Sequence, residues 1–122
     1  MRISAFNPLV LTPKAEETIA LFESLGFERR HTKKGIEGEV TSVSMKDSNG
    51  FRVDVAQVSK FPQSVVAYRM SVDNFEEAYE FLTSRGFRNP QGDRVTDTGS
   101  SHAALLFSPS GFAISLSQHI KE

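Results

Sequence analysis

The sequence predicts an α+β protein made of two tandem copies of one βαβββ module. Three observations support this fold class. The chain repeats itself at a nearly constant spacing, each copy contains one segment with helical periodicity, and strand-like segments lie before and after each helical segment. At 122 residues the chain has the length of one ordinary domain, so we expect a single domain over residues 1–122.

The repeat is clearest in the two helical segments. Residues 14–27 align with residues 74–87 at an offset of 60, and residues 49–55 align with residues 110–116 at an offset of 61. Identical pairs in the first alignment are Glu16/Glu76, Glu17/Glu77, Ser24/Ser84, Gly26/Gly86 and Phe27/Phe87. We therefore place the first module at residues 1–59, a linker at residues 60–63 and the second module at residues 64–122.

Each module contains one amphipathic helix. Apolar residues of the first recur at helical spacing, at Ala15, Ile19, Phe22 and Leu25. Thr12 is suited to be its N-cap, with Pro13 at the first helical position, and Asp73 is suited to be the N-cap of the second helix. Gly26 and Gly86 are suited to end the helices. The sequence thus predicts helices from near Pro13 to near Gly26 and from near Asp73 to near Gly86.

One β-rich segment precedes each helix, and three short strand-like segments follow it. In the first module we expect strands at Ile3–Leu11, Glu28–His31, Val40–Lys46 and Arg52–Val58. In the second module we expect strands at Val65–Val72, Arg88–Asn89, His102–Phe107 and Ala113–Gln118. The polar residues 92–101 are expected to form a loop.

Composition excludes several classes of function. The formal net charge is −1, and no run of Lys and Arg is longer than two residues, which argues against nucleic-acid binding. The chain has no cysteine, so it has no disulfides, no thiolate metal site and no cysteine nucleophile. No segment approaches the roughly 20 apolar residues of a membrane span, and the N-terminal segment lacks the pattern of a signal peptide. A cytoplasmic protein is the expectation.

The paired modules, the helix ends Leu-Gly-Phe and Arg-Gly-Phe, and the hairpin of residues 108–112 together resemble the vicinal-oxygen-chelate superfamily. This superfamily includes glyoxalase I, bleomycin-resistance proteins and extradiol dioxygenases. The resemblance covers the whole chain. It implies that the modules form a curved mixed sheet around a ligand-binding cleft, with the helices on the outer face. Together with the edge strands of such open sheets, it also implies a homodimer.

The resemblance implies four positions for metal ligands. They fall on Asn7, Asp54, Ala67 and Ser115 in this sequence. A divalent metal needs at least three good donors, usually imidazole or carboxylate groups, and only Asp54 is such a donor. We therefore expect no metal and no other cofactor.

Strand alternation separates the residues of the cleft from those of the core. We expect the helices to pack on Phe51, Val53, Val55, Val66, Tyr68, Met70, Phe112, Ile114 and Leu116. The predicted ligand-binding residues are Asn7, Arg52, Asp54, Arg69, Ser71, His102 and Ser115. Arg52 and Arg69 are either solvated surface residues or ligands of a carboxylate or phosphate group. His102 is either a surface histidine or a general base or hydrogen-bond donor beside the cleft.

Three functions remain open. The first is a metal-free protein that binds a small polar or anionic molecule, as bleomycin-resistance proteins do. A second is an enzyme of glyoxalase, dioxygenase or isomerase type with a non-standard or metal-independent site. The third is a purely structural or partner-interaction role. We favour the first because the resemblance is strong while the metal ligands are missing, and we leave the catalytic residues and the ligand unassigned.

Overall fold

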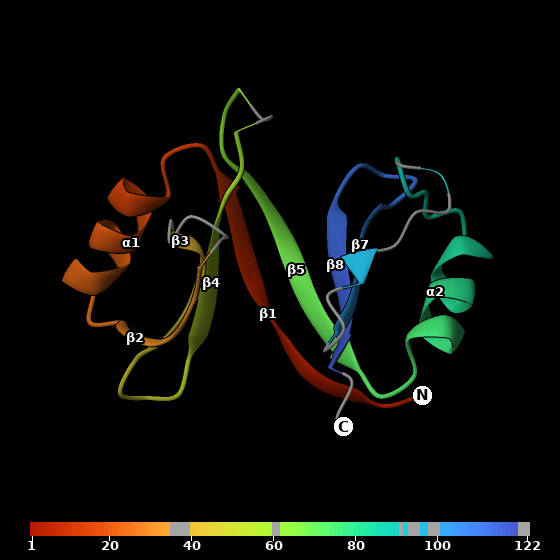
Figure 1. Cartoon of the computed structure of the whole chain (residues 1–122), viewed down its shortest axis with the longest axis horizontal. Coiled ribbons are helices and arrows are strands. Elements are labelled where there is room, and N and C mark those ends of the chain that lie inside the picture. The colour runs from red at the N-terminus through yellow and green to blue at the C-terminus, as the bar shows by residue number, and fades with distance from the viewer. Residues whose placement is uncertain (35–39, 60–61, 91, 93–95, 98–100, 120–122) are drawn as a thin grey trace. The chain divides into compact units, whose positions relative to one another are not determined.

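The structure is a computed structural model, and it describes residues 1–34, 40–59, 62–90, 92, 96–97 and 101–119. In this part of the chain the elements follow the order βαβββ twice (Figure 1). The first module has β1 (Ile3–Thr12), α1 (Ala15–Ser24), β2 (Glu28–Lys34), β3 (Val40–Lys46) and β4 (Arg52–Gln57). The second has β5 (Val65–Val72), α2 (Phe75–Thr83), β6 (Thr96–Asp97), β7 (Ser101–Phe107) and β8 (Ala113–His119). The predicted α+β fold class and tandem modules are confirmed.

The chain forms two compact units whose boundary differs from that of the sequence repeat. One unit comprises residues 7–66. The other comprises residues 67–122 together with residues 1–6. The strands are ordered β2-β3-β4-β1 in the unit of residues 7–66, and β5-β8-β7-β6 in the other, where the first residues of β1 lie beside β5. Residues 60 and 61 of the predicted linker lie outside the described part of the chain.

Each unit has one parallel pair of strands, formed by the first and last strands of the module. β1 runs parallel to β4 with Leu9 opposite Asp54, and β5 runs parallel to β8 with Ala67 opposite Ala113. The remaining described pairs within the two modules are antiparallel. A parallel pair needs a crossover connection, and the helix together with the two intervening strands supplies it.

Each helix covers one face of its sheet. α1 packs through Ile19 on a cluster that includes Val43, Met45, Val53 and Val55. In the unit that contains β5 and β8, α2 packs through Phe75, Ala78 and Leu82. The strand residues beneath it are Met70, Val72, Ala104, Leu106, Ile114 and Leu116. Along β5 and β8 these residues alternate with Arg69, Ser71, Ser115 and Ser117, whereas along β7 the intervening residues Ala103 and Leu105 are also apolar. Burying each large apolar side chain stabilises the fold by roughly 1.5–3 kcal/mol.

Four apolar residues that we expected in this core are instead exposed. Phe51, Val66, Tyr68 and Phe112 have 66%, 59%, 43% and 45% of their surface exposed. They lie in the turns before β4 and β8 or in the first half of β5, whereas the helix packs on the later residues of these strands. Tyr68 is partly covered by other rings, since it stacks on Phe6 at 5.3 Å and meets Phe112 edge to face at 6.1 Å. The predicted alternation of faces along the strands was right, but each helix covers only part of the length of the strands on which it packs.

The short strand β6 corrects one expectation. Arg88, at the predicted second strand of this module, forms only an isolated bridge with Phe107. The strand that pairs with β7 is Thr96–Asp97, inside the segment that we expected to be a loop. Two residues with one polar and one charged side chain carry no apolar alternation from which a strand can be predicted.

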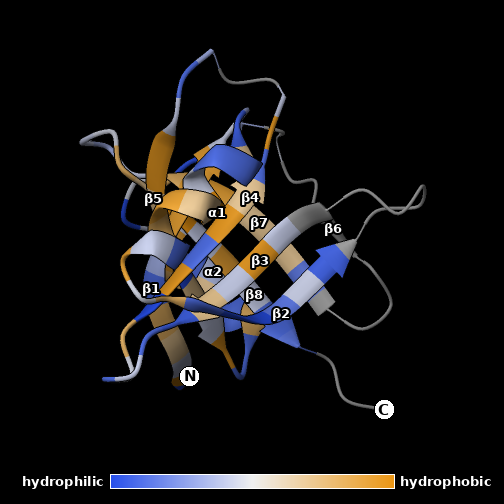
Figure 2. Ribbon diagram, turned by 90° about the vertical axis from the view of Figure 1, so that its left-hand side faces the viewer, coloured by the Kyte–Doolittle hydropathy of each residue, from blue (hydrophilic) through white to orange (hydrophobic). Residues whose placement is uncertain are grey.

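Strand β2 is the edge strand of the unit of residues 7–66 and contains only charged and polar residues. Figure 2 shows it as hydrophilic along its length. Charged side chains on an edge strand discourage pairing with another chain, so this edge is protected against aggregation. In the described part of the chain, neither helix is long and apolar enough to cross a membrane.

Both helices end in the same Schellman motif. Gly26 and Gly86 follow the helices with φ values of 103° and 96°, a conformation that favours glycine, as predicted. In each motif the next amide donates to the carbonyl five residues earlier. These bonds join Phe27 to Phe22 at 3.0 Å and Phe87 to Leu82 at 3.2 Å. The phenyl rings of Phe22 and Phe27 also meet at 5.6 Å, the apolar contact typical of this motif.

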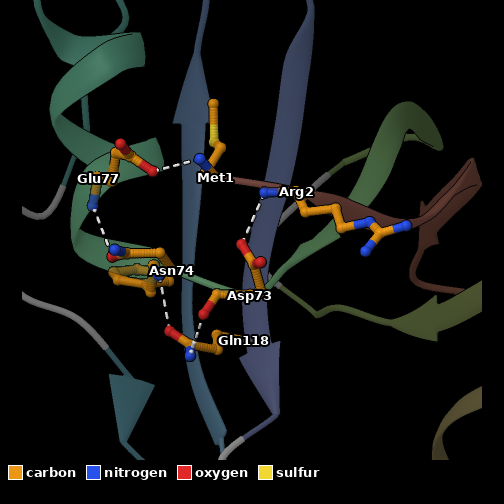
Figure 3. Close-up of polar contacts among 7 residues, drawn as sticks. Met1, Arg2, Asp73, Asn74, Glu77 and Gln118 are labelled. Carbon is orange, nitrogen blue, oxygen red and sulfur yellow. Dashed lines mark hydrogen bonds and ion pairs between the residues drawn. The ribbon is translucent and has the colours of Figure 1, made fainter.

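The helix starts differ from the prediction. α2 begins after Asn74, whose side chain accepts a hydrogen bond from the Glu77 amide at 3.1 Å. Asp73 was therefore the wrong residue for this cap. It accepts a bond from the Arg2 amide at 2.6 Å (Figure 3). α1 has no side-chain cap at its N-cap residue Lys14, although Thr12 accepts a bond from the Lys14 amide at 3.1 Å.

A glutamine near the end of the last strand holds the start of the helix in each module. Gln57 accepts from the Ala15 amide at 2.9 Å and donates to the Pro13 carbonyl at 2.7 Å. Gln118 makes the equivalent pair, to the Phe75 amide at 2.6 Å and the Asp73 carbonyl at 2.8 Å (Figure 3). Each glutamine satisfies an amide that no helical carbonyl can reach, and ties the strand to the helix.

We predict that Gln57→Ala and Gln118→Ala each lower the free energy of unfolding by about 1–2 kcal/mol, because each removes a helix cap and a second hydrogen bond. Chemical denaturation measures the change. The matched control is Gln63→Ala, which truncates an exposed glutamine that lies outside the helices and strands. Equal stability of all four proteins would show that the two glutamines do not hold the helices.

The Met1 ammonium group forms an ion pair with Glu77 in the first turn of α2 (Figure 3). The hydrogen bond and charge of Glu77 raise the pKa of this amino group above its usual value of 8.0, and Asp73 adds a smaller charge effect. The raised pKa means that the folded state holds this proton more tightly than the unfolded state does. The resulting stabilisation is complete below pH 8.0 and is lost as the pH rises through the folded-state pKa.

For the 122-residue chain we therefore predict a fall in melting temperature as the pH rises above about 8, and a weaker fall in Glu77→Gln. The matched control is Glu76→Gln, which removes the same charge from the same helical turn. Thermal melts at several pH values measure the difference. If the Glu77 and Glu76 variants follow the wild-type pH profile alike, the ion pair makes no contribution to stability.

Candidate functional site

The polar residues predicted to bind a ligand occur as two groups, one in each compact unit. In the unit of residues 7–66 they lie on the sheet face away from α1. Asp54 is 5% exposed and lies opposite Leu9 of β1 and Ser44 of β3. Asn7 is 8% exposed, and its side chain donates to the Pro8 carbonyl at 3.1 Å. Arg52 is exposed at the start of β4.

The strand register adds residues that the sequence did not single out. On the same face, His31, Ser44 and Asp54 form one row across β2, β3 and β4. Glu28, Lys46 and Arg52 form the next row. Residues directly opposite on adjacent strands have Cβ atoms roughly 5 Å apart. The row of His31 depends on a register shift between Arg29 and His31, which turns His31 onto this face and is not visible in the residue pattern.

The second group lies in the unit that contains β5 and β8. Arg69 lies opposite Ser115, and Ser71 lies opposite Ser117. The hydroxyl oxygens of Ser71 and Ser117 are 3.2 Å apart. Arg69, Ser71 and Ser115 are half-buried on the sheet face away from α2, as alternation predicts. This group presents one guanidinium group beside several hydroxyl groups.

His102 does not share this surface. It lies opposite Gln118, whose side chain reaches the start of α2. The imidazole meets the Phe75 ring edge to face at 5.9 Å. His102 therefore lies on the face of β7 that α2 covers, and that it takes part in ligand binding stays a prediction. The pairing register of β7 with β8, which the sequence does not reveal, turns this residue toward the helix. That Asn7, Arg52 and Asp54 line one cleft with Arg69, Ser71 and Ser115 stays a prediction.

Comparison with known proteins identifies the fold. No protein-family model matches the chain, and no curated protein matches it. Solved structures do match. A glyoxalase/bleomycin resistance protein/dioxygenase superfamily member from Vibrio splendidus has a TM-score of 0.62 at 15% identity, over 96% of this chain and 99% of that chain. Methylmalonyl-CoA epimerase from Mycobacterium tuberculosis has a TM-score of 0.65 at 11% identity, over 98% and 90% of the two chains.

Glyoxalase I from Zea mays is also similar, with a TM-score of 0.69 at 15% identity. The likeness covers 98% of this chain but only 44% of the maize chain. At such low sequence identity these matches show a shared fold, and they leave activity and substrate to be argued from the residues.

The four implied ligand positions do not fit a metal ion. Ala67 has no donor atom and is fully buried, and Ser115 and Asn7 offer only a hydroxyl and an amide group. The unit that contains Ala67 and Ser115 therefore supplies neither a carboxylate nor an imidazole at these positions. Over the described residues, no group of three or more histidine, aspartate or glutamate side chains is placed to hold a metal.

We predict that the purified protein contains no stoichiometric zinc, nickel or iron, and that EDTA changes neither its melting temperature nor its ligand binding. Elemental analysis and thermal melts measure both. Zinc is added to test whether the protein can bind it, and Asp54→Asn removes the strongest donor among the four implied positions. Tight binding of one metal per chain that is lost in Asp54→Asn would contradict the prediction.

Proposed function

Because the chain has the fold of the vicinal-oxygen-chelate superfamily, we propose that it is a metal-free protein that binds a small polar or anionic molecule on its sheet. The observation that carries the proposal is the group around Arg69. Arg69 lies opposite Ser115 and two residues before Ser71 of the same strand, on the face that α2 leaves uncovered.

The chemistry of this group favours an oxygen-rich ligand. A guanidinium group presents a planar set of donors that matches a carboxylate or phosphate, and neighbouring hydroxyl groups add donors that adjust to the ligand. Removal of metal ligands does not prevent such binding, because hydrogen bonds and charge supply the affinity. The ligand itself is not identified by these residues.

The alternative is an enzyme of glyoxalase, dioxygenase or isomerase type that works without metal. One observation favours it: Asp54 is a buried carboxylate on a polar sheet face, and a buried carboxylate is suited to act as a general base. The similar structures include proteins named as a glyoxalase and an epimerase. The same ligand screen distinguishes the two functions, because an enzyme converts the compound that stabilises it.

We also propose that the protein forms a homodimer. The exposed aromatic residues Phe6, Tyr68 and Phe112 adjoin one another and make an apolar patch larger than single surface residues do. The protected edge at β2 makes pairing through that strand the less favourable route.

For the proposed function, we predict that a thermal-shift screen of small carboxylates, phosphates and carbonyl compounds in EDTA finds a stabilising compound. Arg69→Ala should weaken its binding roughly tenfold to a hundredfold, because a charge-assisted hydrogen bond is lost. Calorimetry measures the affinity. Arg85→Ala is the matched control, since it removes an exposed arginine that lies over the Phe81 ring on α2.

Two outcomes would argue against this assignment. Unchanged affinity in Arg69→Ala would return Arg69 to the role of a surface residue. A large loss of melting temperature in Arg69→Ala without ligand would show that the arginine belongs to the folded core of its unit instead of to a binding surface.

A further inference from the structure

Two cations lie directly opposite each other at the turn end of the β3–β4 hairpin. Lys46 is the last residue of β3, Arg52 is the first residue of β4, and the register pairs them. Both side chains are on the sheet face away from α1, because they alternate with Met45 and Val53 of the core. Like charges placed directly opposite in an antiparallel pair destabilise the sheet.

In the part of the chain that the structure describes, neither Asp47 nor Glu28 forms an ion pair with Lys46 or Arg52. The Asp47 carboxylate in the connecting turn accepts from the amides of Asn49 at 3.0 Å and Phe51 at 2.8 Å, so it serves the turn. Glu28, opposite Lys46 on the other side, forms an ion pair with Arg30 at 3.5 Å. Over the described residues, neither Lys46 nor Arg52 takes part in an ion pair.

The surrounding residues limit what can bind between the two cations. Among the described strand residues, Glu28 and Asp54 are the acids on this face: Glu28 lies opposite Lys46, and Asp54 follows Arg52 two residues along β4. A long polyanion would meet both carboxylates, whereas a single oxyanion would meet only the two cations. The half-buried Ser44, next to Lys46 on the same face of β3, adds a hydroxyl donor within reach of a small ligand.

From this arrangement we infer that Lys46 and Arg52 form a binding site for one small oxyanion, the phosphate or carboxylate group of a ligand. Arg52 supplies a planar pair of donors, and Lys46 supplies a compact charge from the facing strand. The inference rests on the proposed function and deepens it for the unit of residues 7–66, because it names a phosphate or carboxylate as the group bound there. It also gives a reason for two like charges at a place where sheet stability alone disfavours them.

The test uses two probes, inorganic phosphate and malonate, at constant ionic strength set with chloride. Amide chemical shifts of the whole protein are followed by NMR as each probe is added. Saturable shifts are expected at Lys46 and Arg52, and the stronger probe distinguishes a phosphate site from a carboxylate site. Lys46→Gln and Arg52→Gln should each weaken the binding roughly tenfold or more.

The matched control is Lys14→Gln, which removes the same charge from an exposed lysine at the start of α1. It should bind both probes like the wild type. A second readout is the melting temperature without added anion. Lys46→Gln should raise it by about 1–4 °C, because the cross-strand repulsion is removed, whereas Lys14→Gln should not. Phosphate should then stabilise the wild type but not Lys46→Gln.

Shifts that do not saturate, or that are equal in Lys46→Gln and Lys14→Gln, would overturn the inference and leave a general salt effect. This failure is separable from failure of the proposed function. Saturable oxyanion binding at Lys46 and Arg52, with no screened compound whose binding is weakened by Arg69→Ala, would sink the proposed function alone. A compound bound through Arg69, with no saturable phosphate or malonate shifts at Lys46 and Arg52, would sink the inference about Lys46 and Arg52 alone.

Discussion

The parallel pairing of the first and last strands in each module is the constraint on which the rest of the structure depends. Parallel strands cannot be joined by a tight turn, so the chain must leave the first strand, cross over and return beside it. The helix and two antiparallel strands fill this crossover. The glutamine of the last strand then makes two hydrogen bonds to the backbone at the helix start, one to the first helical amide and one to the carbonyl two residues before it. These bonds join the last strand to the start of the helix.

Much of this fold could be predicted from residue patterns, because the repeat, the helical periodicity and the glycine ends are local signals. Gly26 and Gly86 were predictable because few other residues adopt their backbone conformation. Gln57 and Gln118 were not, since a glutamine at a strand end looks like any exposed polar residue. Strand β6 could not be predicted for a related reason. It is a strand because it pairs with β7, and its own residues carry no strand pattern.

The candidate site was predictable where alternation alone decides the face. Asp54, Arg69, Ser71 and Ser115 lie on the uncovered faces for this reason. Residue pairs across strands were less predictable, because a shift of one residue in register exchanges the two faces. The contact of His102 with Phe75 and the pairing of Lys46 with Arg52 could not be predicted for this reason. Function therefore depends on register, which is set by contacts between segments distant in sequence.

The division of β1 between the two compact units has a consequence for how the chain folds. The hydroxyl group of Ser4 bonds to the Ser71 carbonyl, 67 residues away, and the Arg2 amide bonds to Asp73, 71 residues away. Residues 1–6 are synthesised before the residues on which they pack, so this contact closes late and over a long loop. Residues 7–66 can therefore fold before residues 1–6, the beginning of β1, make their contacts with the other unit. No single break in the polypeptide would release either unit as a complete piece, because β1 is divided between the two units.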